Sequence, residues 1–400
     1  MTGPLHIGVL LTAGGNLRQW ENSGTFDRQL ARYRELQKRG MRITIYSPGG
    51  RGELEFASRL PGMRIIVNSM GLPSKLYTRR LHQIHAASLL GIDVLLTDDS
   101  GAMIEALSIS WAWQIPLVCR NSYVLSKNTR LYHPDNPEFA KRVAGLERKT
   151  WNRASHIIAH TTDIADYIID QAPTAKDHLS IMPSFVDTDN FRPLPAAKAY
   201  DLVYVGRITA VKNLEALLKA VQQLGLTIAI IGSGTVLDDG RTDYSEQTRL
   251  QSIFGDLGGR VHWLGRVKNE DLPNYLNQAK IFVISSFSEG IARSLAEGMS
   301  CGLPCIGTDV PGTRTVLQHE VNGYLCDTDS DSIASAIKTV IARPALMRTM
   351  GANARQYALE NCSLTMIAQR KYDLLQDVAR RHPRRSKPAR MLHYLLRRRY

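Results

Sequence analysis

Short apolar runs of strand length alternate with amphipathic helical stretches along most of this 400-residue chain. In the first half such runs occupy 6–12, 41–47, 63–68, 92–98, 116–121 and 156–161, and in the second half 200–206, 227–234, 261–267, 281–286 and 304–308. Apolar runs without polar alternation are typical of strands buried on both faces, and strands separated by helices pair in parallel. The sequence therefore predicts α/β domains, each with a parallel sheet covered by helices.

One segment interrupts this alternation. Residues 182–195 contain three prolines and several turn-forming residues. A chain of 400 residues is long enough for two or three domains. We therefore expect two domains, at 1–184 and 200–362, joined by a linker at 185–199.

The stretch from 281 to 312 predicts a strand, a polar turn, a helix that opens near Gly290 and a second strand. A helix N-terminus has free N–H groups and a positive dipole end, which bind phosphate. Glu289 precedes this helix and Glu297 lies inside it. Eight helical steps rise about 12 Å, so the two carboxylates cannot share one proton or one metal ion. They can contact the two ends of an extended ligand with an anionic middle, such as a nucleotide diphosphate sugar.

The residues 288–312, SEGIARSLAEGMSCGLPCIGTDVPG, resemble the Glu-x7-Glu signature of family 4 retaining glycosyltransferases, and NGYL at 322–325 fits the same pattern. The resemblance covers nearly the whole chain. It implies the GT-B fold, in which two Rossmann-like domains face each other with the active site in the interdomain cleft. By resemblance, 1–184 is the acceptor-side domain, 200–362 binds the nucleotide sugar, and a helix at 363–379 crosses back onto the first domain, before a basic tail at 380–400.

A pair of cations follows the first strand of the second domain. That strand ends at Gly206, Arg207 follows it, and Lys212 comes just before a helix. Both side chains can reach one anion, although a solvated surface pair is the simpler alternative. The spacing is similar to the family's phosphate clamp, in which fixed cations stabilise charge that builds on the leaving phosphate.

The resemblance also assigns roles within the central stretch. It implies that Glu289 contacts sugar hydroxyls near the reacting carbon and that Glu297 contacts the ribose hydroxyls. The backbone amides implied to bind the phosphates are those of Gly290, Ile291 and Ala292. Arg293 replaces a residue that is commonly small or apolar, and it either adds a phosphate or acceptor contact or is a solvated helix residue.

Two further turns are expected to touch the donor. The resemblance places the backbone of Arg266 and Val267 against the nucleotide base, and an ordinary strand–helix turn is the alternative. Gly14 and Gly15 follow the first strand and permit close approach to a ligand. The GxGxxG pattern of dinucleotide binding is absent. In the family a similar loop faces the donor phosphates.

The first domain departs from the family at one position. Relatives carry a histidine after the strand that here ends at 121, where this chain has Arg120, Asn121 and Ser122. His160, at the end of the next strand, either replaces that histidine or is structural. The other polar candidates at these strand ends are Asp98, Asp99 and Thr161. We expect Asp98 and Asp99 to cap the following helix.

Neither a metal nor an organic cofactor is expected, because no Asp-x-Asp pair stands at a strand end; Asp187 and Asp189 lie in the linker. The five cysteines are scattered, without CxxC spacing, and are interpreted as reduced core thiols.

The net charge of +13 is concentrated near the end of the sequence, because 380–400 contains nine Lys or Arg residues and no Asp or Glu. Cations among apolar residues suit an anionic membrane surface. A disordered, solubilising tail is the alternative, and nucleic acid is not expected because no binding motif accompanies the charge. No apolar run is long enough to span a bilayer, and the start lacks a signal sequence. We therefore expect a cytoplasmic protein, peripheral on the inner face of the membrane.

The resemblance implies a glycosyltransferase that moves a sugar from a nucleotide sugar to a hydroxyl acceptor with retention of configuration, and the donor is expected to be a UDP-sugar because the family most commonly uses one. Basic residues in the tail, at Arg79 and Arg80 and on the first helix, which includes Arg32, suggest a lipid-linked or membrane-proximal saccharide acceptor, as in bacterial polysaccharide, lipopolysaccharide or glycolipid assembly. A solvated basic helix face explains the first-helix charges equally well. Two alternatives remain open. A nucleotide-sugar epimerase of the same architecture would need no acceptor, and a non-enzymatic membrane or nucleic-acid adaptor would show no turnover.

Overall fold

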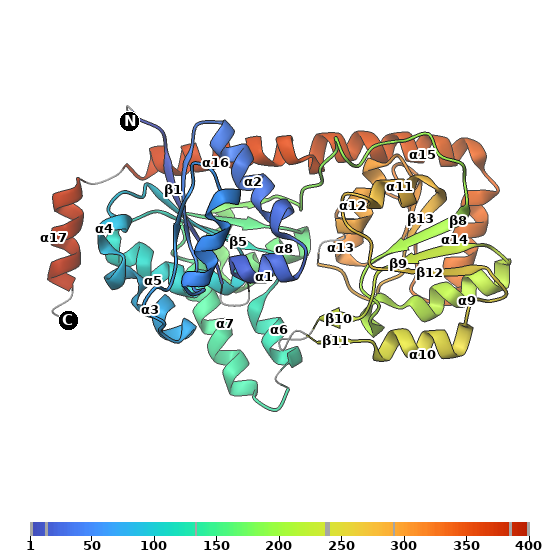
Figure 1. Cartoon of the computed structure of the whole chain (residues 1–400), viewed down its shortest axis with the longest axis horizontal. Helices are drawn as coiled ribbons and strands as arrows, with labels where there is room; N and C mark the ends of the chain where they lie inside the picture. The colour runs from blue at the N-terminus through green and yellow to red at the C-terminus, as the bar shows by residue number, and fades with distance from the viewer. Residues whose placement is uncertain are drawn as a thin grey trace. The chain divides into compact units, whose positions relative to one another are not determined.

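The computed structural model describes residues 3–12, 15–132, 134–236, 241–290, 293–383 and 386–397. The chain divides into two compact units. The first comprises Met1–Met182 and Ala368–Tyr400, and the second comprises Pro183–Ile367. The chain therefore leaves the first unit once and returns to it through its last residues, as the colour ramp in Figure 1 shows.

The first unit contains a seven-stranded parallel sheet in the order β3-β2-β1-β4-β5-β6-β7. Its strands are β1 (His6–Leu10), β2 (Arg42–Tyr46), β3 (Arg64–Ile66), β4 (Val94–Thr97), β5 (Leu117–Asn121), β6 (His156–Ala159) and β7 (Leu179–Ile181). The chain starts at the centre, moves to one edge and then returns past β1, which pairs with β2 through Ile7↔Ile43 and with β4 through Ile7↔Val94. The carboxyl ends of β1 and β4, on either side of this reversal, are where such sheets bind ligands.

Helices cover the first sheet. They are α1 (Leu17–Asn22), α2 (Phe26–Lys38), α3 (Ser74–Ile84), α4 (Ala86–Leu89), α5 (Met103–Trp113), α6 (Leu125–Tyr132), α7 (Pro137–Trp151) and α8 (Thr162–Gln171), with 3-10 turns η2 (Arg51–Arg59), η3 (Ser100–Ala102) and η4 (Pro173–His178). Every residue of β4 is buried, which explains why its sequence lacks polar alternation. The core under α5 is built around Trp113 and Trp151, each about 1% exposed or less.

The second unit contains a six-stranded parallel sheet in the order β12-β9-β8-β13-β14-β15 and a separate two-stranded hairpin. The sheet strands are β8 (Tyr200–Val205), β9 (Ile228–Ile231), β12 (Val261–Gly265), β13 (Ala279–Ile284), β14 (Cys305–Thr308) and β15 (Tyr324–Cys326), and the hairpin is β10 (Thr235–Val236) with β11 (Thr242–Asp243). Its helices are α9 (Leu214–Leu224), α10 (Ser245–Phe254), α11 (Leu272–Asn277), α12 (Arg293–Ser300), α13 (Pro311–Arg314), α14 (Ser330–Ile341) and α15 (Pro344–Tyr357), with η5 (Ala210–Lys212) and the π-helix η6 (Ala358–Cys362).

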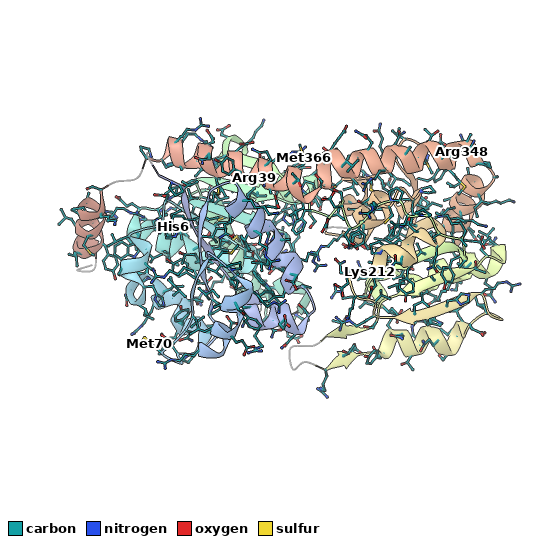
Figure 2. All side chains as sticks on the ribbon, turned by 45° about the horizontal axis from the view of Figure 1, so that its top comes forward. His6, Arg39, Met70, Lys212, Arg348 and Met366 are labelled. Atoms are coloured by element: carbon teal, nitrogen blue, oxygen red, sulfur yellow. The ribbon has the colours of Figure 1, made fainter. Side chains whose placement is uncertain are left out.

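Two helices end the described chain. Helix α16 (Leu364–Arg381) begins in the second unit and continues in the first from Ala368 onward. There Arg39 Nε donates to Gln369 Oε1 at 3.1 Å, and Figure 2 shows Arg39 beside this helix. Helix α17 (Lys387–Arg397) then packs on α5 of the first unit (Figure 1).

The predicted α/β class is confirmed, since both units contain a parallel sheet covered by helices. The sequence did not predict β7, β15, the β10–β11 hairpin or α17. These strands are two or three residues long, too short to give a periodic signal. In the part of the chain that the structure describes, no helix combines the length and apolarity needed to cross a bilayer.

Candidate functional site

Three glycine turns lie side by side at the carboxyl edge of the second sheet. Gly206 and Gly232 directly follow β8 and β9, and Gly265 is the last residue of β12. Gly206 N–H donates to Ile231 O at 3.0 Å, and Gly232 N–H donates to Gly265 O at 2.8 Å. Gly232 has φ +142, and a Cβ there would lie 1.8 Å from Gly206 O. No other residue fits this close backbone approach.

The turn after β13 is tied to the turn after β8. Lys212 Nζ lies 2.6 Å from Glu289 Oε1, and the two side chains are 15% and 5% exposed. Ser285 Oγ donates to Lys212 O at 2.9 Å, and Ser286 Oγ donates to Glu289 Oε1 at 2.5 Å. Two of the predicted catalytic residues are therefore in direct contact, and Figure 2 labels Lys212 in the second unit.

Glycine also positions Glu289 from the other side. A Cβ at Gly312 would lie 2.3 Å from Glu289 O and 2.8 Å from Glu289 Cβ. Thr308 Oγ1 donates to Ser286 O at 2.6 Å, which holds the turn before Glu289 on the end of β14. These contacts fix the backbone at Glu289, and Lys212 and Ser286 hold its carboxylate.

Arg207 is exposed, unlike Lys212. Its backbone carbonyl accepts a hydrogen bond from Tyr204 Oη at 2.9 Å. Within the described ranges, the Arg207 guanidinium makes no ion pair. It is therefore available to an anionic ligand at this edge, whereas Lys212 is already paired with Glu289.

Glu297 lies in α12 and is 6% exposed. Asn269 Nδ2 donates to Glu297 Oε1 at 3.2 Å, from the turn that follows β12. The helix is pressed against β13, because a Cβ at Gly298 would lie 2.8 Å from the Phe282 ring. A buried carboxylate held by an amide donor is suited to accept hydroxyl hydrogen bonds.

The remaining predicted positions are placed as follows. Gly290 and Arg266 are exposed, Val267 is partly buried against the second-unit core, and Arg293 is the first residue of α12. Gly15 follows β1 and donates its N–H to Thr12 O at 3.2 Å. The predicted phosphate contacts Gly14, Ile291 and Ala292 lie outside the described residues.

The polar strand ends of the first unit form a buried charge cluster. Arg32 on α2 makes an ion pair with Asp98, which also accepts from Tyr33 Oη. Arg120 Nε donates to His160 Nε2 at 2.8 Å, and Arg120 Nη1 donates to Asp98 O at 2.5 Å.

Burial is the largest influence on this cluster. It lowers the pKa of Arg120 to about 10, with Arg32 as the next cause. Lys371 on α16 is 5% exposed, and burial followed by the charges of Arg120 and Arg32 brings its pKa well below the usual range. Burial thus disfavours the charged forms of Arg120 and Lys371 in the region where the family histidine is missing.

Two expectations are corrected here. Asp98 does not cap the next helix, because its carboxylate is taken by Arg32; Asp99 alone caps, accepting from Ser100 N at 2.7 Å. Arg32 is buried rather than part of a solvated basic face. Its burial could not be predicted, because Arg28, Arg34 and Lys38 on the same helix are partly or fully exposed and give the same sequence signal.

Ser286, Asn269 and Lys371 were missed altogether. Ser286 is the last residue of a predicted strand, and that position is a usable signal for a residue at the ligand edge. Asn269 and Lys371 carry no such signal, since each resembles an ordinary turn or helix residue.

The described residues contain no group of three His, Cys, Asp or Glu side chains that could hold a metal ion. All five cysteines are free thiols, as expected, and burial raises the pKa of Cys301 to about 12.

Two family matches divide the chain. Glycosyltransferase Family 4 matches residues 30–190, and Glycosyl transferases group 1 matches residues 186–357. A D-inositol 3-phosphate glycosyltransferase of Geodermatophilus obscurus is 29% identical over 272 residues, which is 62% of this chain and 58% of that protein. The chain thus spans less than two thirds of that relative's length.

Solved structures share the fold. HepE of Anabaena, in complex with UDP, superimposes with a TM-score of 0.75 at 18% identity, covering 93% of this chain and 100% of that one. Sucrose-phosphate synthase of Thermosynechococcus elongatus gives 0.74 at 19% identity, covering 94% and 99%.

Proposed function

We propose, on the premise that both family matches and the shared fold indicate a GT-B glycosyltransferase, that this chain transfers a sugar from a UDP-sugar to a hydroxyl acceptor with retention of anomeric configuration. One observation carries the proposal. The Lys212–Glu289 pair lies at the same sheet edge as the glycine turns, within the segment that Glycosyl transferases group 1 matches. This edge combines close backbone access, cations and oriented carboxylates.

The residues then have separate roles. The turns at Gly206 and Gly232 let the diphosphate approach the backbone. Arg207 and Lys212 neutralise charge on the β-phosphate as the bond to the sugar breaks, which stabilises the transition state more than the ground state. Glu297 accepts hydrogen bonds from the ribose hydroxyls, and Glu289 does so from the sugar.

The transfer breaks the bond between the anomeric carbon and the β-phosphate oxygen. The acceptor oxygen forms its new bond on the same face, and its proton passes to the departing phosphate. No carboxylate is assigned as a covalent nucleophile, because Glu289 is already bound to Lys212 and Ser286.

The proposed identities of the donor and of the acceptor are supported by different observations. The HepE structure is a complex with UDP, which favours a UDP-sugar as the donor here. A hydroxyl of a lipid-linked or saccharide acceptor in polysaccharide, lipopolysaccharide or glycolipid assembly is proposed from the sequence. We propose no metal requirement.

The identity of the donor nucleotide is tested by thermal unfolding of the purified protein. The ligands are UDP, GDP and ADP forms of common nucleotide sugars, each with and without EDTA. A ligand that binds only the native state stabilises it by about 2.7 kcal/mol at a hundredfold excess over its dissociation constant. We expect a UDP-series shift that is lost in Glu297→Ala and kept in Glu270→Ala, a change at a neighbouring residue whose side chain is 74% exposed.

A shift with another base would contradict the UDP assignment, and no shift with any nucleotide would contradict the transferase. A product assay then separates the alternatives. An epimerase converts the UDP-sugar without acceptor, whereas the proposed enzyme releases UDP in proportion to glycoside formed.

A further inference from the structure

Helix α17 packs against the first unit through Arg390, Met391 and Tyr394, of which the two apolar side chains join the core around Trp113. Arg390 is 1% exposed, and its Nε donates to Trp113 O at 2.8 Å while Nη1 donates to Ile92 O at 3.1 Å. The ring of Tyr394, one turn later, stacks on Trp113 with centroids 4.2 Å apart and planes 12° apart.

The partners of Arg390 explain this orientation. Trp113 is the last residue of α5, and Ile92 closely follows the end of α4. Carbonyls near helix C-termini lack intrahelical donors and carry partial negative charge, so a buried guanidinium satisfies them. Arg390 therefore fixes which side of α17 faces inward.

The consequence is a helix with apolar residues facing outward. Leu392 and Leu395 lie opposite Arg390 on the helix and are 58% and 50% exposed. A surface helix of a globular protein normally buries its apolar stripe. Here the described leucines are left in contact with solvent.

Cations from a distant part of the sequence lie beside this helix. The His82 ring of α3 is 6.2 Å from the Tyr394 ring, so α3 and α17 are neighbours. Helix α3 exposes Leu76 together with three cations, and α17 adds Lys387. We call this set the α3–α17 surface: Lys75, Leu76, Arg79, Arg80, Lys387, Leu392 and Leu395.

The two segments that carry this surface contribute only positive charge. Residues 56–92 and 378–400 contain no Asp or Glu. Glu105 of α5 is partly buried, and its negative charge interacts with Arg79 of this surface. Exposed leucines with surrounding cations match the boundary of an anionic bilayer, where apolar side chains enter the acyl region and cations meet the headgroups.

We propose that the α3–α17 surface binds the face of a membrane that contains anionic lipid. The proposal does not depend on the transfer chemistry. From the sequence we expected that the tail at 380–400 binds the membrane. In the structure Arg390 of this segment is buried in the protein, and α3 supplies three of the four cations of the α3–α17 surface.

Co-sedimentation of the full chain with vesicles tests this. The vesicles are phosphatidylcholine alone or with about a third phosphatidylglycerol, and each near-surface cation is expected to contribute about fivefold to the binding constant. We compare wild type, Leu392→Ser/Leu395→Ser, Arg79→Gln/Arg80→Gln, and the control Ile253→Ser, which removes a residue 55% exposed on α10 of the second unit.

We expect binding to the anionic vesicles only, weakened about tenfold or more by either double change and by raised salt, and unaffected by Ile253→Ser. The nucleotide-induced thermal shift should be the same in all four proteins, which separates this test from that of the proposed function. Absence of vesicle binding would overturn the proposal. So would binding to duplex DNA that survives the leucine changes, or a concentration-dependent dimer that those changes abolish without any vesicle binding.

Discussion

Lys212 and Glu289 neutralise each other where the donor is proposed to bind. A diphosphate that approaches this edge competes with Glu289 for Lys212. The exposed Arg207 is not occupied in that way, so it is suited to make the first contact with phosphate. Binding would then exchange one ion pair for another, which limits the cost of removing Lys212 from its carboxylate.

His156 gives a prediction at the residue scale. Burial lowers its pKa to about 4, with Arg381 as the next cause. An unfolded histidine titrates near 6.5. As the pH falls from about 6.5 to about 4, the unfolded state therefore binds a proton that the folded state does not bind. The free energy of unfolding decreases by about 3 kcal/mol over that window.

Urea unfolding at several pH values measures this effect. In His156→Gln, whose amide can still reach Ser180, the free energy of unfolding should fall less steeply below about pH 6.5. The difference in slope should correspond to the uptake of up to one proton fewer on unfolding. The variant and wild type should differ by a constant above pH 7. An unchanged slope in the variant would assign the acid sensitivity to other groups.

The site shows what sequence can predict at this scale. Lys212 and Glu289 were both chosen, because each flanks a strand end at a spacing with a recognisable pattern. Their bond was not predicted, because it joins residues 77 positions apart and depends on the turns after β8 and β13 meeting. The Arg32–Asp98 ion pair was missed for the same reason, since neither residue signals its partner 66 positions away.

At the scale of elements, the second sheet depends on how closely its turns approach. The turns after β8, β9 and β12 are joined by backbone hydrogen bonds at Gly206, Gly232 and Gly265. Apolar runs predicted the strands, because burial on both faces leaves a clear pattern. The lateral contact between turns leaves only a glycine in the sequence, which also fits an ordinary turn.

Gly232→Ala tests this contact. Its Cβ would lie 1.8 Å from Gly206 O at a backbone φ of +142, so we expect a loss of about 3 kcal/mol or more in stability and a loss of the nucleotide-induced shift. Gly145→Ala on α7 is the control, because a Cβ there meets nothing within 4 Å.

The control should be neutral or stabilising by about 0.5–1 kcal/mol, as expected for alanine in a helix. Thermal unfolding with and without UDP reports both quantities. Equal stability of Gly232→Ala and wild type would mean that the turns separate easily and do not form a rigid edge.

At the scale of the whole molecule, each unit has its own hydrophobic core. The first is built around Trp113 and Trp151, and the second has clusters on both faces of its sheet. The division into two α/β units was predicted from the proline-rich interruption near 182–195. The family resemblance led us to expect that a helix at 363–379 crosses back onto the first domain, but not that α17, within the expected basic tail at 380–400, also belongs to the first unit.

Separate cores predict separate responses to a core mutation. Leu117→Ala in β5 removes a fully buried side chain of the first unit, and we expect a loss of about 3 kcal/mol there. Hydrogen exchange followed by mass spectrometry should then show faster exchange in β4–β6 and unchanged exchange in β8 and β9.

Leu202→Ala in β8, also fully buried, is the matched change and should produce the reverse pattern. Faster exchange in both units from either single change would show that they unfold as one cooperative body.

The return of 368–400 to the first unit also sets an order of events on the ribosome. The second unit lies between the two parts of the first, so all of its residues are translated before α16 is complete. Until α17 emerges from the exit tunnel, Trp113 lacks the Tyr394 ring and the carbonyls at the ends of α4 and α5 lack Arg390. The unit translated first is thus the last to be finished, because Arg390 and Tyr394 join it only after all of the second unit has been translated.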